Sequence, residues 1–265
     1  MSATLTNLGY AGIAFAYVVD LANDSEVEDT RLTPLGRGIA LGDDSEHGSV
    51  RYRSRKTSYE FTTVSGRREL RVDIPHFDSG RGLRIDAVLD DPPGREAVCI
   101  ATPMGDRGFY WNRKGNALPA SGSVTWGDRV VELAPETCLG QLDWGRGRWP
   151  YRTHWVWASA TGVVGGARQV GLNLGYVDGD RSAATEDALY LDGRVHKLGR
   201  VRVELDPADY RRPWRFTDPG GRLEVTLTPD HERVARTNLG LVRSTVHQMF
   251  GRYDGYAIDD TGERV

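Results

Sequence analysis

The residues best suited to chemistry lie in and around one run rich in tryptophan and arginine, Asp143 to Trp157. Carboxyl and imidazole groups transfer protons, which makes four side chains candidate catalytic groups: Asp143, His154, Glu186 and His196. In a tryptophan-lined cavity a carboxyl group keeps its proton to higher pH, because its charged form is disfavoured. We therefore predict Asp143 or Glu186 as the proton donor and His154 or His196 as the partner base.

The candidate ligand-binding residues are aromatic, amide and basic side chains of the kind that line pockets for small molecules. They are Trp144, Arg146, Arg152, Trp155, Trp157, Asn173, His247 and Gln248. The predicted ligand is a hydrophobic small molecule, and no cofactor is expected.

Structural roles remain open for two of the candidate acids and bases. Asp143 with Arg146 or Arg152 would form an ion pair that braces the run, because arginine is the usual partner of a buried carboxylate. His196 beside Asp187 would form a charge pair at a surface or a sheet edge.

Composition and spacing disfavour other kinds of site. The six histidines are scattered without HxH or HExxH spacing and no CxxC is present, so no metal site is expected. A glycine-rich phosphate loop and a GxSxG elbow are both absent. The formal net charge of -3 gives no basic footprint for a nucleic-acid partner. Two cysteines are too few for a disulfide scaffold, and reduced thiols are expected.

The elements that must position these residues are β-strands. Apolar residues alternate with polar ones in short segments separated by glycine, proline, aspartate and asparagine, and no window shows a helical stripe. We predict an all-β, antiparallel protein of two packed β-barrel or sandwich halves, residues 1–134 and 135–265. A proline between Ala134 and Thr137 marks the boundary.

The tryptophan- and arginine-rich run divides into two parts. Asp143 to Pro150 holds two glycines and a proline, which predicts an irregular loop. Tyr151 to Ser159 alternates as a strand, with Trp155 and Trp157 on one face. His154 and Arg152 share the opposite face, so His154 either faces solvent or lines a polar cavity.

The following segment, Gln169 to Tyr176, is also two-faced. One face is apolar, and the other is an almost bare row of Gly171, Asn173 and Gly175. Glycine inside a strand marks a bend, a bulge or the close approach of a ligand or a large neighbour. Trp155 or Trp157 packing over this row is the structural alternative to a ligand.

Asp192-Gly193 between two alternating segments predicts a two-residue type I′ hairpin. Leu191 would then pair with Arg194, and Leu189 with His196. The same register predicts two diagonal charge pairs, Asp187 with His196 and Glu186 with Lys197.

The N-terminal apolar segment Leu8 to Val19 lacks the flanks of a signal peptide and is too short to span a bilayer. We expect it to be a buried strand, with no membrane insertion and a cytoplasmic location.

Several long motifs resemble a known family. They are LDWGRGRWPYRTHWVWASATG, VGLNLGYVDG, TEDALYLDGRVHKLG and HQMFGRYDG, and a looser match begins at NLGYAG. In this order they resemble the bacterial family called domain of unknown function 2804. Asp187 departs from the asparagine usual after Thr-Glu, and the family's further N-terminal segment is expected to be missing. An open sheet edge left there could pair with a second copy as a homodimer.

The resemblance extends distantly to calycin-like proteins, which include carotenoid hydratases, cofactor-free cyclases and lipocalins. It implies antiparallel lipocalin-like barrels around an apolar cavity. Two functions follow: a cofactor-independent hydratase, isomerase or cyclase acting on an isoprenoid, lipid or polyketide, or a non-catalytic lipid-binding protein. A protein-interaction module with an exposed aromatic patch is a third.

Overall fold

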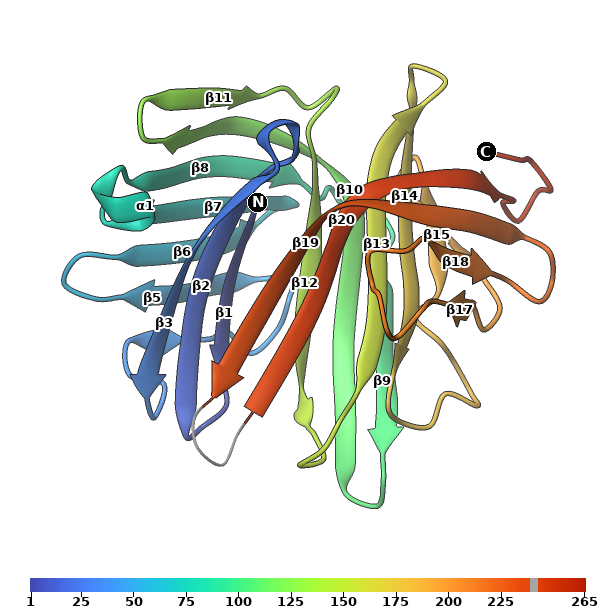
Figure 1. The fold of residues 1–265 in the computed structure, drawn as a ribbon, viewed down its shortest axis with the longest axis horizontal. Coiled ribbons are helices and arrows are strands. Elements are labelled where there is room, and N and C mark those ends of the chain that lie inside the picture. The colour runs from blue at the N-terminus through green and yellow to red at the C-terminus, as the bar shows by residue number, and fades with distance from the viewer. Residues whose placement is uncertain (239–242) are drawn as a thin grey trace. The chain divides into compact units, whose positions relative to one another are not determined.

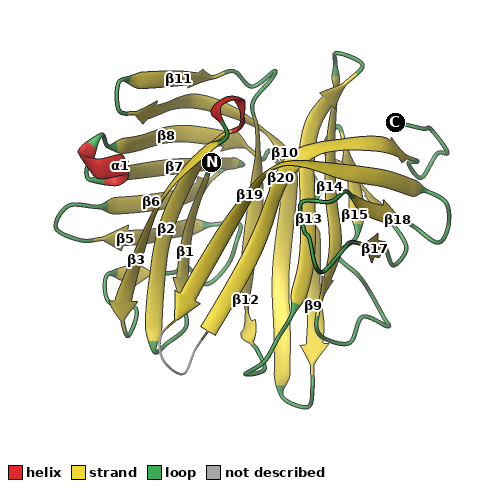
Figure 2. Cartoon of the chain, viewed as in Figure 1, coloured by secondary structure: helices red, strands yellow, loops and turns green. Residues whose placement is uncertain are grey.

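The computed structural model describes residues 1–238 and 243–265, and the chain divides into two compact units. The first unit comprises Met1–Asp20, Ser25–Arg95 and Leu118–Gln141, and the second Leu21–Asp24, Glu96–Ala117 and Leu142–Val265. Antiparallel strands dominate both units (Figure 2). In the described residues helix is limited to η1 (Leu21–Asn23) and α1 (Phe77–Gly80). The predicted all-β, antiparallel fold is confirmed.

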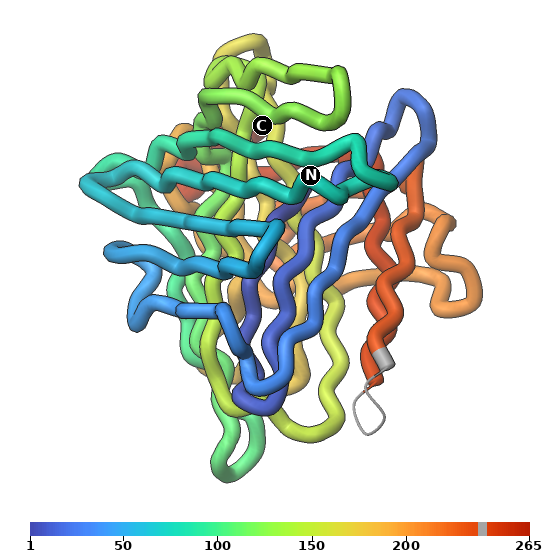
Figure 3. Tube along the Cα trace, turned by 90° about the vertical axis from the view of Figure 1, so that its left-hand side faces the viewer, coloured from blue at the N-terminus to red at the C-terminus, as the bar shows by residue number. Residues whose placement is uncertain are grey.

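Two sheets supply the strands of the first unit (Figures 1 and 3). A three-stranded sheet has the order β1-β2-β3, with β1 (Ser2–Asn7), β2 (Ala11–Asp20) and β3 (Ser25–Pro34). A nine-stranded sheet contains the path β11-β10-β8-β7-β6-β5-β4. Its strands there are β4 (Ile39–Ala40), β5 (Gly48–Arg53), β6 (Ser58–Val64), β7 (Arg67–Ile74), β8 (Leu83–Asp90), β10 (Gly108–Trp126) and β11 (Arg129–Leu133).

The second unit includes the first part of β10, from Gly108 to Ala117. Two strands pair with β10: β9 (Val98–Met104) and β12 (Leu139–Arg148). A four-stranded sheet follows with β13 (Trp155–Val164), β14 (Arg168–Val177), β15 (Ala188–Leu191) and β16 (Arg194–Lys197). A second has β17 (Arg202–Glu204), β18 (Trp214–Thr217), β19 (Leu223–Asn238) and β20 (Arg243–Ala257).

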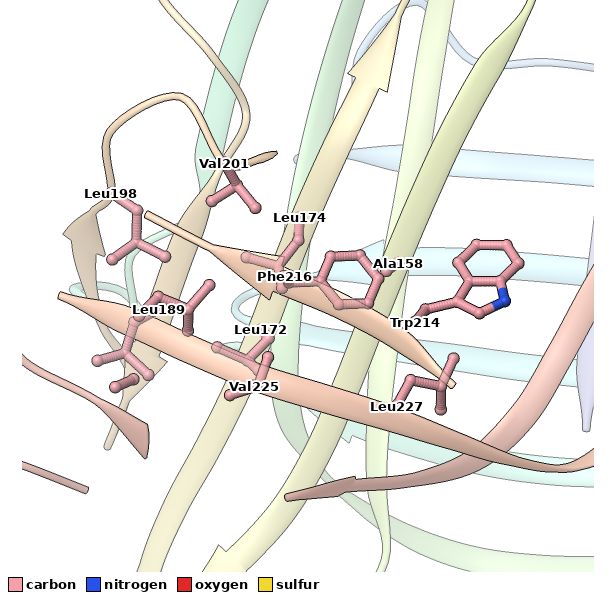
Figure 4. Close-up of a cluster of buried hydrophobic side chains, with 12 residues drawn as sticks. Ala158, Leu172, Leu174, Leu189, Leu198, Val201, Trp214, Phe216, Val225 and Leu227 are labelled. Atoms are coloured by element: carbon pink, nitrogen blue, oxygen red, sulfur yellow. The ribbon is translucent and has the colours of Figure 1, made fainter. Parts of the chain in front are cut away.

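The two four-stranded sheets share one apolar core (Figure 4). Leu172 and Leu174 of β14 pack in it with Phe216 of β18 and Val225 of β19. These leucines form the apolar row that alternation predicts for β14, and that row is confirmed as core. The bare row of β14 points the other way, toward the site described below.

No sheet of the described residues closes into a barrel, so the calycin-like barrel is not observed as such. Both cysteines, Cys99 and Cys138, are free. None of the helices in the described part of the chain is long and apolar enough to cross a membrane.

The predicted hairpin is confirmed in its register. Leu191 pairs with Arg194 and Leu189 with His196, around a turn in which Asp192 and Gly193 have positive φ angles of 49° and 83°. Both central residues of a type I′ turn need that conformation.

The diagonal charge pairs predicted from this register are wrong, because nearer groups compete for the same side chains. Asp187 accepts hydrogen bonds from the backbone N–H groups of Gly175 (2.8 Å) and Val201 (3.1 Å). His196 instead lies 3.2 Å from Asp260, and the Lys197 ammonium donates to the backbone oxygens of Thr185 and Asp187.

The predicted irregular loop from Asp143 to Pro150 is also wrong, because β12 continues to Arg148. Its glycines allow a close neighbour that a side chain would block. A Cβ on Gly145 would lie 2.5 Å from the Tyr110 ring, and one on Gly147 would meet the Phe109 backbone oxygen. The strand penalty of glycine is therefore offset by packing against β10.

Asp187 gives the fold a pH dependence. Burial raises the pKa of Asp187 from 3.8 to about 6, despite its two backbone hydrogen bonds. A carboxyl group with a raised folded-state pKa stabilises fully below its unfolded pKa, and this stability is lost as pH rises through the folded value. We expect Asp187→Asn to flatten the fall in unfolding free energy between about pH 4 and pH 7, by on the order of 2–3 kcal/mol. Urea unfolding across this range measures it.

The exposed turn residue Asp128 provides the matched control, Asp128→Asn. Equal pH slopes for Asp187→Asn and the parent protein would contradict the assignment, whatever the absolute stability of the variant.

Gly145 tests the packing of β12 on Tyr110. We expect Gly145→Ala to destabilise by about 1–3 kcal/mol, since its Cβ overlaps a ring that is itself packed against Trp149 at 4.7 Å. Gly162→Ala on β13 is the control, because a Cβ there meets nothing within 4 Å. Equal urea midpoints for the two variants would contradict this prediction, because they would show that the Tyr110 ring moves aside without a cost in stability.

Candidate functional site

The candidate site lies in the second unit, around one face of β10. Alternation places Tyr110, Asn112, Lys114 and Asn116 on the same face of that strand. Asn112, Lys114 and Asn116 are each at most 5% exposed. A row of buried polar side chains in a strand needs partners from neighbouring elements, because an unpaired buried polar group is costly.

Lys114 is the centre of this group. Its ammonium nitrogen lies 2.5 Å from the Asp143 carboxylate of β12 and 3.9 Å from the Glu186 carboxylate. It also lies 4.7 Å from the centre of the Trp157 ring, a cation–π geometry. The Lys114 backbone oxygen accepts a 2.7 Å hydrogen bond from the Tyr190 hydroxyl. One cation is thus shared between two carboxylates and an aromatic face.

Glu186 is the buried carboxyl group of the site, with its side chain only 10% exposed. It precedes β15 and accepts a 3.2 Å hydrogen bond from the Asn112 amide. Burial raises the pKa of Glu186, and the neighbouring Lys114 ammonium opposes that rise. The Asp143 carboxylate adds to it. Burial therefore favours the protonated form of Glu186.

Asp143 differs from Glu186 in its access to solvent. Its side chain is 47% exposed, whereas that of Lys114 is 6% exposed. The pair therefore reaches from the buried interior to a position that water can contact. Burial, followed by the Asp143 and Glu186 charges, raises the pKa of the Tyr110 hydroxyl well above its usual range. Tyr110 stays neutral beside this pair.

The bare row of β14 accommodates the other side of the site. The Trp157 indole N–H donates to the Asn173 amide oxygen at 2.8 Å, and the Asn173 amide donates to the Glu186 backbone oxygen at 2.9 Å. Trp157 lies opposite Gly175 in the strand register, while a Cβ on Gly171 would lie 2.5 Å from the Asn116 side chain. Trp157 thus contacts the row at Asn173, and the Asn116 side chain lies against Gly171.

Four predicted site residues thus come together: Asp143, Glu186, Trp157 and Asn173. Tyr110, Asn112 and Lys114 were missed, although their spacing at every second position of one strand was visible in the sequence. Asp143 was expected to pair with an arginine, and its ion pair is made with Lys114.

The two candidate histidine bases have other surroundings. His154 is exposed and precedes β13, which begins at Trp155 and not at Tyr151 as predicted. Its backbone N–H donates to Asp178. His196 is on β16, and its side chain lies 3.2 Å from the Asp260 carboxylate.

The remaining predicted ligand-binding residues lie on other surfaces of this unit. Trp144 packs against Trp111 on the opposite face of β12, and Trp155 packs against Trp149. Arg146 and Arg152 are exposed. On β20 His247 lies 2.7 Å from Glu232, and the Gln248 oxygen accepts from Arg233.

The same unit has a shallow hollow of about 290 Å³, and none of the predicted catalytic or ligand-binding residues lines it. It is lined by Ala97, Val98, Cys99, Ile100, Ala184, Thr185, Val195 and Lys197. Burial lowers the pKa of Lys197, whose ammonium is already held by two backbone oxygens. Within the described residues no three or more His, Cys, Asp or Glu side chains form a group that could hold a metal ion.

The Lys114 charge makes a testable contribution to stability. Removing it with Lys114→Met leaves two carboxyl groups without their cation, so the pKa of Glu186 rises further. A raised carboxyl pKa stabilises the fold at low pH and loses that stability as pH rises. We expect a loss of about 3 kcal/mol at pH 8 and a smaller loss at pH 5.

Urea unfolding at both pH values measures this difference. The double variant Lys114→Met/Glu186→Gln should lose most of the added pH dependence, and Lys56→Met at an exposed turn should show none. A loss independent of pH would mean that Lys114 acts only through packing.

Comparison with solved structures finds a similar fold in a candidate AttH from Nitrosomonas europaea. The two proteins share 13% sequence identity with a TM-score of 0.50, over 92% of this chain and 79% of the other. At that identity the likeness concerns the fold alone. Comparison with curated proteins finds no match. The family model described as domain of unknown function (DUF2804) matches residues 1–265. The chain therefore belongs to the DUF2804 family, as its motifs around Asp143 and Glu186 predict.

Proposed function

We propose that the second unit carries a cofactor-independent proton-transfer site for a hydrophobic small molecule such as an isoprenoid, lipid or polyketide. The observation that supports this most is the buried Glu186 carboxyl group, whose pKa is raised by burial although a lysine ammonium lies 3.9 Å away. A carboxyl group with a raised pKa keeps its proton to higher pH and can donate that proton to an alkene or a carbonyl. Acid-catalysed hydration, isomerisation and cyclisation of an alkene all begin with that step.

The other residues have distinct roles in the proposal. Lys114 adjusts the proton affinity of Glu186 and holds Asp143 at the solvent-accessible end. Asp143, whose side chain is 47% exposed, takes the base role that the sequence assigns to His154 or His196. Trp157 and Tyr110 supply aromatic surface beside the acid, which favours an apolar substrate and a cationic transition state.

The proposal includes the calycin-like likeness expected from the sequence, because folds of that kind place a ligand between strands. We also propose the cytoplasmic location and the homodimer that the sequence leads us to expect. The structural likeness to the Nitrosomonas europaea protein supports the fold comparison only.

A non-catalytic lipid-binding protein is the second candidate. The short Lys114–Asp143 contact favours it, because an ammonium satisfied by an ion pair and a tryptophan face can also be purely structural. In that case Glu186 and Asn112 would only orient a polar head group.

The two candidates differ in proton exchange with carbon. Incubation with a panel of isoprenoid alkenes in D₂O should incorporate deuterium at carbon if Glu186 is a general acid. We expect Glu186→Gln to lower the exchange rate at least about a hundredfold and Asp143→Asn to lower it less. Mass spectrometry of the recovered alkenes measures both.

Asp178→Asn serves as the control, because Asp178 accepts from the His154 backbone outside the cluster. Binding of these alkenes without deuterium incorporation, unchanged in Glu186→Gln, would favour the lipid-binding protein. Exchange that persists in both Glu186→Gln and Asp143→Asn would reject the proposed site.

A further inference from the structure

One end of the second unit gathers three chain segments, which we call the aromatic tip: residues 105–109, 146–155 and 178–182. The Asp180 N–H donates to the Pro103 oxygen at 2.8 Å, and the Asp178 N–H donates to the His154 oxygen at 3.0 Å. Gly108 packs so closely on β12 that a Cβ there would lie 2.8 Å from the Arg148 backbone oxygen. These contacts join the β9–β10 turn, the end of β12 and the β14–β15 connection (Figure 1, lower end).

Large aromatic side chains are exposed at this tip. Tyr151 is 80% exposed and Trp149 42%, and Phe109 and Trp155 are also exposed. Trp149 touches Trp155 at a ring separation of 6.5 Å. Neighbouring exposed rings at one end of a unit differ from the scattered apolar residues of an ordinary surface, and such patches mark interaction sites.

The tip is also locally basic. Its three segments contain five arginines, Arg107, Arg146, Arg148, Arg152 and Arg181, and three aspartates, Asp106, Asp178 and Asp180. The whole chain carries a formal net charge of -3, so the tip has the opposite sign to the remainder. Two of the aspartates cap backbone N–H groups, at His154 and Ser182. The three segments therefore hold two more arginines than aspartates, and Arg148 and Arg152 flank the exposed Trp149 and Tyr151.

We propose that the aromatic tip docks this protein on the surface of an anionic lipid bilayer. Tryptophan and tyrosine favour the head-group level of membranes, because their rings are apolar while the indole N–H and the phenol O–H remain hydrated. Arginines beside them gain from the negative potential of anionic lipids. In the run Arg148-Trp149-Pro150-Tyr151-Arg152 both features alternate within one exposed segment.

A bilayer fits these residues better than a nucleic acid or a protein. The formal net charge of -3 does not favour binding to a phosphate backbone. Trp149 and Tyr151 lie in the connection between β12 and β13, where they can enter a head-group layer without disturbing a sheet, and Phe109 and Trp155 lie at the ends of β10 and β13. The contact is peripheral and holds whether or not the Lys114–Glu186 site is catalytic.

Vesicle sedimentation tests the proposal. The full chain should bind vesicles of equal parts phosphatidylcholine and phosphatidylserine, and bind phosphatidylcholine alone at least tenfold more weakly. Arg148→Ala/Arg152→Ala should reduce binding to the mixed vesicles roughly thirtyfold, since each basic residue contributes about 1 kcal/mol at an anionic surface and 1.4 kcal/mol is tenfold. Tyr151→Ala should weaken binding several-fold with little effect on folding, because the ring is 80% exposed.

Two control variants make the same kinds of change away from the tip. Arg55→Ala/Lys56→Ala removes two exposed charges between β5 and β6, and Tyr10→Ala removes a ring that is 55% exposed. Circular dichroism and urea unfolding check that every variant folds.

Binding that is lost in the tip variants and retained in the controls supports the docking surface. No binding to mixed vesicles, or binding reduced equally by tip and control variants, overturns it. Self-association of the parent chain that disappears in Tyr151→Ala, without vesicle binding, overturns it in favour of a second copy of the chain.

Discussion

The packing of the second unit depends on the burial of one charged group, the ammonium of Lys114 on β10. Removing an ammonium group from water costs several kcal/mol even after the protein relaxes, and only a close countercharge with further hydrogen bonds offsets that cost. Lys114 has Asp143 at 2.5 Å, Glu186 at 3.9 Å and the Trp157 ring at 4.7 Å. Each partner comes from a different element, so the ammonium constrains how β10, β12 and β13 and the segment before β15 pack.

That constraint accounts for small residues where large ones would strengthen the strands. Gly145 lets Tyr110 lie over β12 next to Asp143, and Gly171 makes room for Asn116. Asn173 then links Trp157 to the Glu186 backbone. The polar face of β14 serves the site and its apolar face serves the core, so one strand separates two environments. A hydrophobic residue in place of Asn173 would leave the indole N–H and a backbone oxygen unpaired.

The sequence predicts those features that depend on neighbours along the chain. The Asp192-Gly193 turn sets its own register through its positive φ angles, and β14 shows its two faces through simple alternation. Pairings between distant segments follow other rules. Nothing local to Lys114 shows that Asp143 lies beside it, and the glycines of β12 look like a loop until Tyr110 is known to cover one of them. The predicted ion pair between Asp187 and His196 does not form, because the backbone N–H groups of Gly175 on β14 and of Val201 occupy the Asp187 oxygens.

The charges within the cluster explain why the pKa of Glu186 is raised although a lysine lies beside it. One ammonium faces two carboxylates, so full ionisation leaves a net negative charge in a site where Lys114 and Glu186 are nearly inaccessible to water. Protonating one carboxyl group removes that excess. Glu186 is buried and lies farther from the ammonium than Asp143 does, so burial outweighs the attraction of Lys114 and the pKa of Glu186 is raised.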